Sequence, residues 1–195
     1  MPPKFNRARI QAMKYLALLS IGIILWPLLE YLLHRFSGHV FRFPPIFFNE
    51  HKKHHAKKDY FAPKLKKLGA AIIFLSLLTL INTLWLNSLE ALVFSTGFVG
   101  MYLFYEYMHY QFHISEPKTK AGLILRKHHF YHHFHNSSLN HGVTSTFLDR
   151  IFGTYSDAGQ VKIPRRYAMT WLFDENNQVK KIYQKDFLVT GRASN

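Results

Sequence analysis

The chain has 195 residues, no cysteine and a formal net charge of +14 with histidine neutral. The missing cysteine excludes disulfides, thiolate metal sites and iron–sulfur clusters. Strong basicity is typical of nucleic-acid-binding proteins, but here the basic residues flank hydrophobic segments and no nucleic-acid-binding module is present. Attraction to anionic lipid headgroups explains the charge better, so we expect a membrane partner and no nucleic acid.

Three charge-free runs predict membrane helices: Tyr15–Leu29, Leu68–Leu89 and Ala91–Tyr105. The second run is long enough to cross a bilayer. With the third it predicts a hairpin that turns at Asn87–Ser88, with Ser88 as the N-cap of a helix from Leu89 to His113. No small-residue cleavage site follows the first run, so we expect an anchor and not a cleaved signal.

Charge also predicts sidedness. Lys and Arg outnumber the acids between Arg35 and Lys67, which favours a cytoplasmic position for this loop, and a hairpin returns the chain to the same side. The basic N-terminal tail conflicts with this topology if the first segment spans. Either the tail crosses, or the segment, bent at Pro27, only dips into one leaflet. We expect a multi-pass protein of a bacterial inner membrane or the endoplasmic reticulum.

Ten of the 13 histidines fall into four clusters: His34 and His39; His51, His54 and His55; His109 and His113; His129, His132 and His133. Positions i, i+3 and i+4 share one helix face, so each of the last three clusters presents its rings in one direction. The first pair, five residues apart, needs a break, which Ser37–Gly38 offers. Neutral imidazole is the commonest protein ligand for transition metals, and ten rings suit two ions.

The ligand set narrows the chemistry. Nitrogen ligation without sulfur suits iron, zinc or copper, but zinc has no redox chemistry and a zinc hydrolase needs only about three protein ligands. Two iron ions activate O₂ for attack on the unactivated C–H bonds of a lipid. We therefore predict two irons, with zinc as a substitute, and no catalytic residue beyond the ligands. Glu30 and Glu106 are expected to accept N–H bonds from ligand imidazoles.

Four stretches resemble the histidine boxes of the integral-membrane fatty acid hydroxylase and sterol desaturase superfamily: EYLLHRFSGH (Glu30–His39), HKKHH (His51–His55), YEYMHYQFH (Tyr105–His113) and HFYHHFH (His129–His135). HGVTSTFLDRIFGTY (His141–Tyr155) is similar to the segment that closes the family's domain. The resemblance implies a hydroxylase-like membrane domain over residues 1–155 that uses two metals and O₂. Residues 156–195 would form a polar C-terminal extension.

The resemblance also implies how the histidines divide between the metals. One metal would take His34, His51, His54, His129 and His132. The other would take His39, His55, His109, His113 and His133. His141 stands where the family commonly has an aromatic residue, so His128, His135 and His141 are expected behind the ligands or at the surface.

Each hydroxylation needs two electrons from outside, because the sequence has no GxGxxG motif and no segment expected to bind flavin, nicotinamide or haem. The donor would be a ferredoxin or a b-type cytochrome with its reductase. The basic residues Lys52, Lys53, Lys57 and Lys58 are a candidate docking face for an acidic carrier. The alternative is that they form a basic belt facing lipid.

The predicted fold is an all-α membrane protein: a helical bundle with a transmembrane hairpin, an N-terminal membrane helix and a cytoplasmic, histidine-rich di-metal cap. Short β pieces are expected around Tyr167–Phe173 and Val179–Phe187, with a turn at Asp174–Gln178. The predicted function is a monooxygenase that hydroxylates a fatty acyl chain. A carotenoid ring hydroxylase and a sterol-type desaturase are alternatives, and a metal-binding membrane protein is the alternative without catalysis. Apolar segments without liganding groups argue against a metal carrier.

Overall fold

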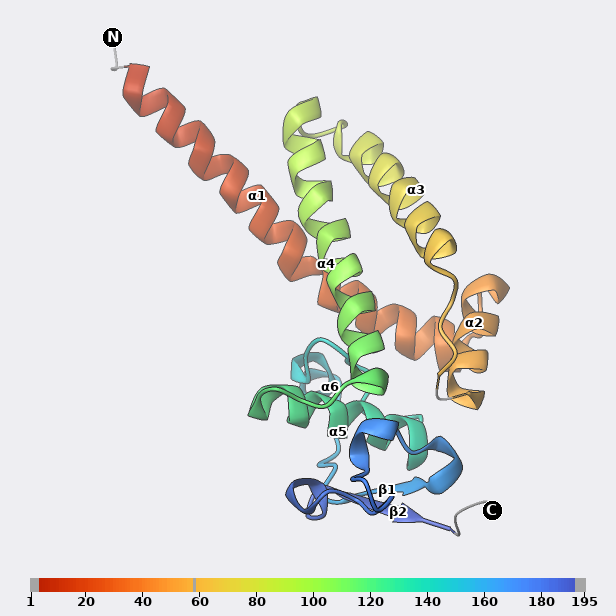
Figure 1. Ribbon diagram of the computed structural model, residues 1–195. Coiled ribbons are helices and arrows are strands. Elements are labelled where there is room, and N and C mark those ends of the chain that lie inside the picture. The colour runs from red at the N-terminus through yellow and green to blue at the C-terminus, as the bar shows by residue number, and fades with distance from the viewer. Residues whose placement is uncertain (1–3, 58, 192–195) are drawn as a thin grey trace. The chain divides into compact units, whose positions relative to one another are not determined.

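The computed structural model describes residues 4–57 and 59–191, which fold as two compact units (Figure 1). The helical unit comprises residues 4–29 and Ala62–Glu106, and the histidine unit comprises Glu30–Phe61 and residues 107–191. In chain order the helices are α1 (Lys4–Leu32), the π-helix η1 (Leu33–Val40), α2 (Pro45–Ala56), α3 (Lys64–Asn82), α4 (Ser88–Ile114), α5 (Lys120–Phe134) and α6 (Phe147–Ile151). The strands β1 (Val161–Pro164) and β2 (Phe187–Thr190) follow, with short 3₁₀ turns at Arg165–Tyr167, Thr170–Leu172 and Lys181–Tyr183.

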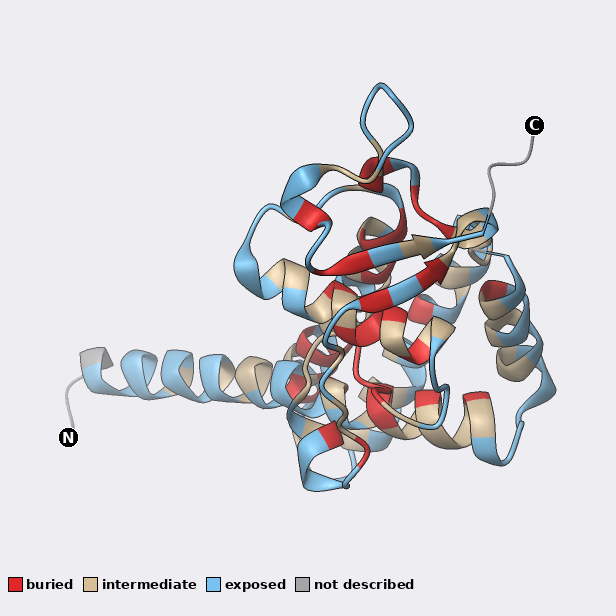
Figure 2. Ribbon diagram, turned by 90° about the horizontal axis from the view of Figure 1, so that it is seen from below, coloured by how far each residue is buried: buried red, intermediate tan, exposed pale blue. Residues whose placement is uncertain are grey.

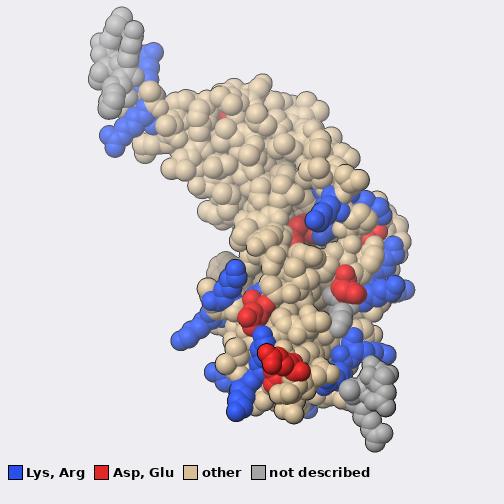
Figure 3. Space-filling model, in the orientation of Figure 1, with Lys and Arg blue, Asp and Glu red and all other residues tan. Residues whose placement is uncertain are grey.

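Three helical segments of the described chain are long and apolar enough to cross a membrane: Asn6–Val40, Lys64–Asn82 and Ser88–Ile114. Large apolar side chains such as Leu16, Ile72 and Leu77 are exposed on them, and Figure 2 shows exposure along most of α1. On the face drawn in Figure 3, Lys and Arg gather at the N-terminal end of α1, and a long stretch of the helical unit beyond it is almost free of them. The predicted N-terminal membrane helix and transmembrane hairpin are therefore confirmed.

Two glycines let α1 and α4 cross with their backbones in contact. A Cβ atom on Gly22 would overlap the carbonyl oxygen of Phe94, and one on Gly97 would overlap that of Leu19. Small residues at such crossings are typical of membrane helix pairs, which associate through close packing. Beyond the crossing, the buried ring of Trp26 packs edge-on against Phe98 at a centroid distance of 5.5 Å.

The start of α4 differs from the prediction in one detail. The side-chain oxygen of Asn87 accepts the Glu90 backbone N–H at 3.0 Å, so Asn87 caps the helix and Ser88 is its first residue. Lys14 of α1 then pairs with the Glu90 carboxylate at 2.6 Å. Lys14 thus lies beside the first turn of α4, and Trp26 lies farther along it, so α1 runs parallel to α4 within this unit. This course favours a full span over a shallow dip.

The histidine unit has a core of aromatic side chains between α5 and the C-terminal strands. β1 and β2 pair in parallel, with Val161 opposite Phe187. The indole N–H of Trp171 donates to the Phe112 carbonyl at 3.2 Å, and the Trp171 ring lies 6.5 Å from that of Phe130. These contacts fix α5 against the end of α4. Both helices carry histidine clusters.

The predicted β pieces were wrong in position. Strands form at Val161–Pro164 and Phe187–Thr190, because the pairing is parallel and joins segments far apart in sequence. The turn at Asp174–Gln178 is confirmed: Phe173 and Val179 form an antiparallel bridge, and the Asp174 N–H donates to the Gln178 carbonyl at 2.9 Å. The domain boundary at residue 155 stays a prediction, although residues 156–191 belong to the same compact unit as the histidines.

Candidate metal centre

The first histidine pair is aligned by a π-helix and not by a break. Residues Leu33–Val40 continue α1 as η1, and the Phe41 N–H donates to the Phe36 carbonyl five residues back at 2.7 Å. This wider turn brings residue i+5 back toward the face of residue i, so the rings of His34 and His39 lie with their centroids 5.4 Å apart. The prediction of a break at Ser37–Gly38 was therefore wrong. Gly38 has a different role, because a Cβ there would lie 2.9 Å from the Cδ2 atom of the His51 ring.

The other clusters lie on regular α-helices, as predicted from their spacing. His51, His54 and His55 lie on α2, and His109 and His113 lie on the last turns of α4. His129, His132 and His133 lie on α5. The four clusters come together in the histidine unit, where their rings contact one another.

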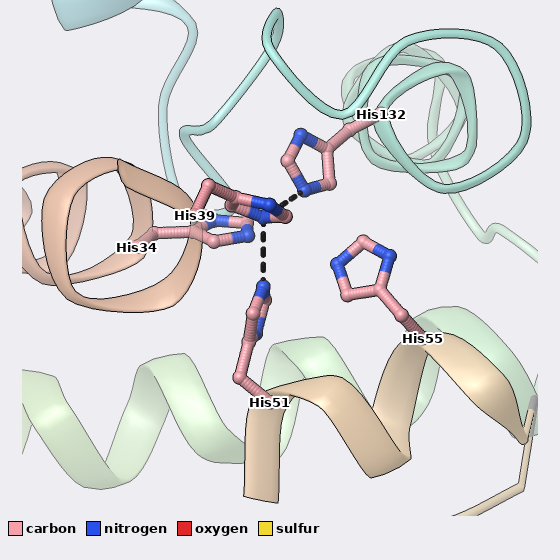
Figure 4. Close-up of side chains that lie close together, drawn as sticks. All are labelled: His34, His39, His51, His55 and His132. Atoms are coloured by element: carbon pink, nitrogen blue, oxygen red, sulfur yellow. Dashed lines mark hydrogen bonds between the residues drawn. The ribbon is translucent and has the colours of Figure 1, made fainter. Parts of the chain in front are cut away.

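The ten rings form two groups of five whose ligand atoms lie within 4.8 Å of one another. The first group is His34, His39, His51, His55 and His132 (Figure 4). The second group is His54, His109, His113, His129 and His133. The two groups are in contact, because the ring of His55 in the first group stacks on that of His133 in the second, with centroids 4.1 Å apart.

This grouping corrects the split that the resemblance implied. His39 and His55 join the first group, and His54 and His129 join the second. The reason is helix geometry: on an α-helix residue i+4 lies about 40° from residue i, whereas i+3 lies about 60° away on the other side. In each HxxHH cluster the outer two histidines therefore stay together, and the i+3 histidine, His54 or His132, turns to the other group.

Within each group the Nε2 atoms converge. Nε2 of His39 lies 2.8 Å from that of His51 and 2.9 Å from that of His132, as Figure 4 shows. In the second group Nε2 of His113 lies 3.0 Å from that of His129. Nitrogens bound to one ion at about 2.1 Å and at right angles to each other lie about 3 Å apart.

Burial keeps these rings neutral, which is the form that binds a metal. Desolvation, followed by the proximity of other imidazoles, holds the pKa of His51 well below its usual value. The same causes lower the pKa values of His129, His132 and His133.

Backbone carbonyls orient the ligand rings from behind. Nδ1 of His54 donates to the Tyr60 carbonyl at 2.9 Å, and Nδ1 of His132 donates to the Leu139 carbonyl at 2.7 Å. Nδ1 of His34 donates to the carbonyl of His141. Such bonds fix the tautomer that carries its proton on Nδ1, so Nε2 is left as the metal-binding atom.

Two of these carbonyls, those of Leu139 and His141, belong to one loop that buried Asp149 holds in place. Its carboxylate accepts the backbone N–H groups of His141 and Gly142, both at 2.8 Å. It also accepts from the Thr154 hydroxyl at 2.8 Å and from Nε2 of His128 at 2.9 Å. Burial raises the pKa of Asp149, but these hydrogen bonds outweigh it and lower the pKa overall.

Glu30 secures the far end of the same loop, so its predicted role was wrong. Its carboxylate accepts the N–H of Val143 at 2.6 Å and the N–H and hydroxyl of Thr144 at 3.0 and 2.5 Å, and not an imidazole. Glu106 belongs to the helical unit, where it pairs with Lys67, and its predicted role stays a prediction.

The three histidines expected outside the ligand set lie outside both groups. His128 is buried against Asp149, and the ring of His135 accepts the Lys162 N–H at 2.8 Å. His141 is buried beside the first group and donates from Nε2 to the Ser138 carbonyl at 3.1 Å.

The donor set fits two transition-metal ions. Each group is nitrogen-only, which suits iron, zinc or copper. Nε2 of His34, His55 and His133 is buried and has no hydrogen-bond partner among the described residues, which is costly unless something else binds it. A membrane protein with a pair of adjoining all-histidine metal sites is the class that this fold and site define.

Comparison with known proteins identifies the family to which the chain belongs. The fatty acid hydroxylase family profile matches residues 19–154, which is most of the chain. The chain therefore belongs to the fatty acid hydroxylase family.

Characterised relatives carry related names. The chain is 29% identical to a dihydroceramide fatty acyl 2-hydroxylase of Arabidopsis thaliana, over 70% of this chain and 60% of that protein. It is 33% identical to a ceramide very long chain fatty acid hydroxylase of Saccharomyces cerevisiae, over 71% of this chain and 38% of that protein. The chain thus spans about three fifths of the first relative and about two fifths of the second.

A solved structure is also similar. Full-length scs7p, of which only the hydroxylase domain is visible, superposes with a TM-score of 0.59 at 29% identity. The match covers 76% of this chain and 58% of that one.

Proposed function

We propose that this protein is a membrane-bound lipid hydroxylase that inserts one oxygen atom of O₂ into a fatty acyl chain. The observation that carries the proposal is the pair of adjoining five-histidine groups in a chain of the fatty acid hydroxylase family. The relatives named above are hydroxylases of fatty acyl groups, which favours an acyl substrate over a carotenoid or a sterol. The hydroxylase domain would be residues 1–155, followed by the extension.

The metals are proposed to be iron, for which zinc would be a substitute without redox activity. When bound, two irons supply the O₂ activation needed to attack an unactivated C–H bond. The residues of this chain would hold and orient the metals: ten imidazoles offer ring nitrogens, and the loop carbonyls of Leu139 and His141 fix two of the rings. Six of the ten histidines are buried and the other four are half-buried, which limits the access of bulk water to the ligand shell.

The reaction needs an external electron donor. One oxygen atom of O₂ enters the C–H bond, and the other leaves as water after taking up two electrons and two protons. We propose that a ferredoxin or a b-type cytochrome with its reductase supplies them. Lys52 and Lys53 of α2 and the following Lys57 offer exposed positive charge for an acidic carrier, while Lys58 lies outside the described residues.

The lipid substrate would come from the bilayer in which the three apolar helices lie. We propose that the centre works on the cytoplasmic face of a bacterial inner membrane or of the endoplasmic reticulum. The basic excess of the loop Arg35–Lys67 supports this side. Reporter fusions at Lys57 and Gly191 test it: both should report the cytoplasm, and reporters on opposite sides would rule out a shared centre.

Lipid mass spectrometry tests the activity. Cells that express the chain should gain, in one class of acyl lipid, species heavier by one oxygen atom. His132→Ala should abolish the gain because it removes a ligand of the first group. His135→Ala is the matched control, since this ring lies outside both groups and should leave the activity intact. An unchanged lipid profile, in cells where the protein is folded and metal-loaded, would contradict the proposal.

A further inference from the structure

A short apolar segment of the histidine unit is exposed although it belongs to no helix of the membrane hairpin. Residues 40–46 run from the last residue of η1 into the first turn of α2, and every one of them is exposed. Val40, Phe41, Phe43 and Ile46 are 55%, 70%, 69% and 73% exposed. Clustered apolar exposure of this kind marks an interaction site, because water disfavours it.

The backbone of the segment suits a position in the polar–apolar boundary of a bilayer. Pro44 and Pro45 have no N–H group that would need a partner, and the Phe41 N–H donates to the Phe36 carbonyl. Arg42 takes up the left-handed conformation, with φ 57°, at the turn between the two phenylalanines. Phe41, Pro44 and Pro45 therefore bring no unpaired donor into a medium that cannot hydrogen-bond one.

The charges around the segment favour lipid over a protein partner. The Arg35 guanidinium lies 5.2 Å from the Phe36 ring, which stacks on Phe41 at 5.4 Å, and that of Arg42 lies 5.8 Å from the Phe48 ring. Cationic groups that lie beside apolar side chains are typical of interfacial segments. There the cation reaches the phosphate layer while the apolar side chains stay in the acyl layer. From Arg35 to Lys57 the single acid is Glu50, which Lys53 approaches within 3.6 Å.

We propose that residues 40–46 insert into the interfacial layer of the membrane, with the apolar side chains in the acyl boundary and Arg35 and Arg42 on anionic headgroups. The segment adjoins the first histidine group, because the Phe47 ring lies parallel to that of His51 with centroids 6.1 Å apart. Insertion would thus hold this side of the centre at the lipid surface. The proposal concerns membrane contact alone and does not depend on the activity.

The missing cysteine makes a direct test simple, since one introduced thiol is the only labelling site. Phe43→Cys is the test variant. Leu77→Cys, exposed on α3, is the lipid control, and Asn176→Cys, on an exposed turn of the histidine unit, is the water control. Each full-length variant carries a fluorophore and is reconstituted in phosphatidylcholine vesicles with and without phosphatidylglycerol.

Lipid-borne nitroxide should quench the label at Phe43→Cys about as strongly as at Leu77→Cys, and aqueous iodide should quench it several-fold less than at Asn176→Cys. Quenching by iodide as strong as at Asn176→Cys would overturn the proposal, because the segment would lie in water. Shielding from both quenchers would also overturn it, because a protein surface, such as a second copy of the chain, would cover the segment. A metal content equal to that of the unlabelled parent shows that the variant is folded.

Arg42→Glu in the Phe43→Cys background tests the headgroup contact. We expect weaker nitroxide quenching than for Phe43→Cys alone when phosphatidylglycerol is present, and a smaller difference without it. If Arg42→Glu changed the quenching equally with and without phosphatidylglycerol, the proposed contact with anionic headgroups would be overturned.

Discussion

The two histidine groups have the same number of ligands but are built differently. Four of the five rings in the second group come from i, i+4 pairs on the regular helices α4 and α5. The first group depends on the π-helix η1, on the missing side chain of Gly38 and on carbonyls of a loop held by Asp149 and Glu30. A regular helix positions ligands by its periodicity, whereas irregular backbone needs support from distant residues. The first group should therefore be the more sensitive to changes outside its ligands.

The largest effect is expected from removing one ligand of each group. His132→Ala should lower the bound metal from two ions to one per chain by emptying the first group, and His54→Ala should do so by emptying the second. Each variant should abolish activity, because one of its two metal sites lacks a ligand nitrogen. Elemental analysis of purified protein checks this. Loss of both ions from either variant would mean that the two groups do not bind independently.

Asp149→Asn should affect the first group and not the second, although it changes no ligand. It replaces a buried carboxylate that accepts four hydrogen bonds, and so loosens the loop whose carbonyls orient His34 and His132. We expect about 10–100-fold weaker metal binding in the first group only. Competition with a chelator measures it, and Asp157→Asn, at an exposed carboxylate, is the control. Equal weakening of both groups would contradict the comparison.

Gly38→Ala should have a smaller effect on the same group. The new Cβ would lie 2.9 Å from the His51 ring, which must shift by a few tenths of an ångström. We expect metal binding in the first group to weaken several-fold, in the same chelator assay. Gly69→Ala is the control, because a Cβ there meets no atom within 4 Å and the change favours the helix. Unchanged metal binding would show that the ring adapts without loss.

Acid should destabilise the metal-free fold through rings of both groups. Burial lowers the pKa values of His51 and His132 in the first group and of His129 and His133 in the second. As the pH falls below about 6.5 the unfolded chain takes up protons at these rings and the folded chain does not, so stability falls. Thermal unfolding of the metal-free protein between about pH 8 and pH 5 measures this, and a flat curve would contradict it.

Sequence spacing identified much of the site because its signal is local. The ten histidines found from four clusters are the ten that gather in two groups, and the helix predicted from Leu89 to His113 differs from α4 by one residue at each end. The pairing of the outer two histidines in each HxxHH cluster was also within reach, since the angles at i+3 and i+4 favour it, but spacing alone does not tell which clusters share a group.

The rest depended on contacts that no local pattern carries. Glu30 and Thr144 are 114 positions apart, so nothing around either residue indicates their bond. Asp149 in the closing segment gave no sign that it would hold the loop behind two ligands. The π-helix has no reliable sequence signal, and the parallel pairing of β1 with β2 joins residues separated by a long connection.

The exchange of one histidine between the two HxxHH clusters has a consequence for biosynthesis. His54 of α2 completes a site made otherwise from α4 and α5, and His132 of α5 completes the site made from η1 and α2. The first site lacks a ligand until His132 has been synthesised and the second until His133, in both cases after the hairpin. A metal ion held by all five histidines of either group would therefore be acquired late, after the synthesis of all three apolar helices.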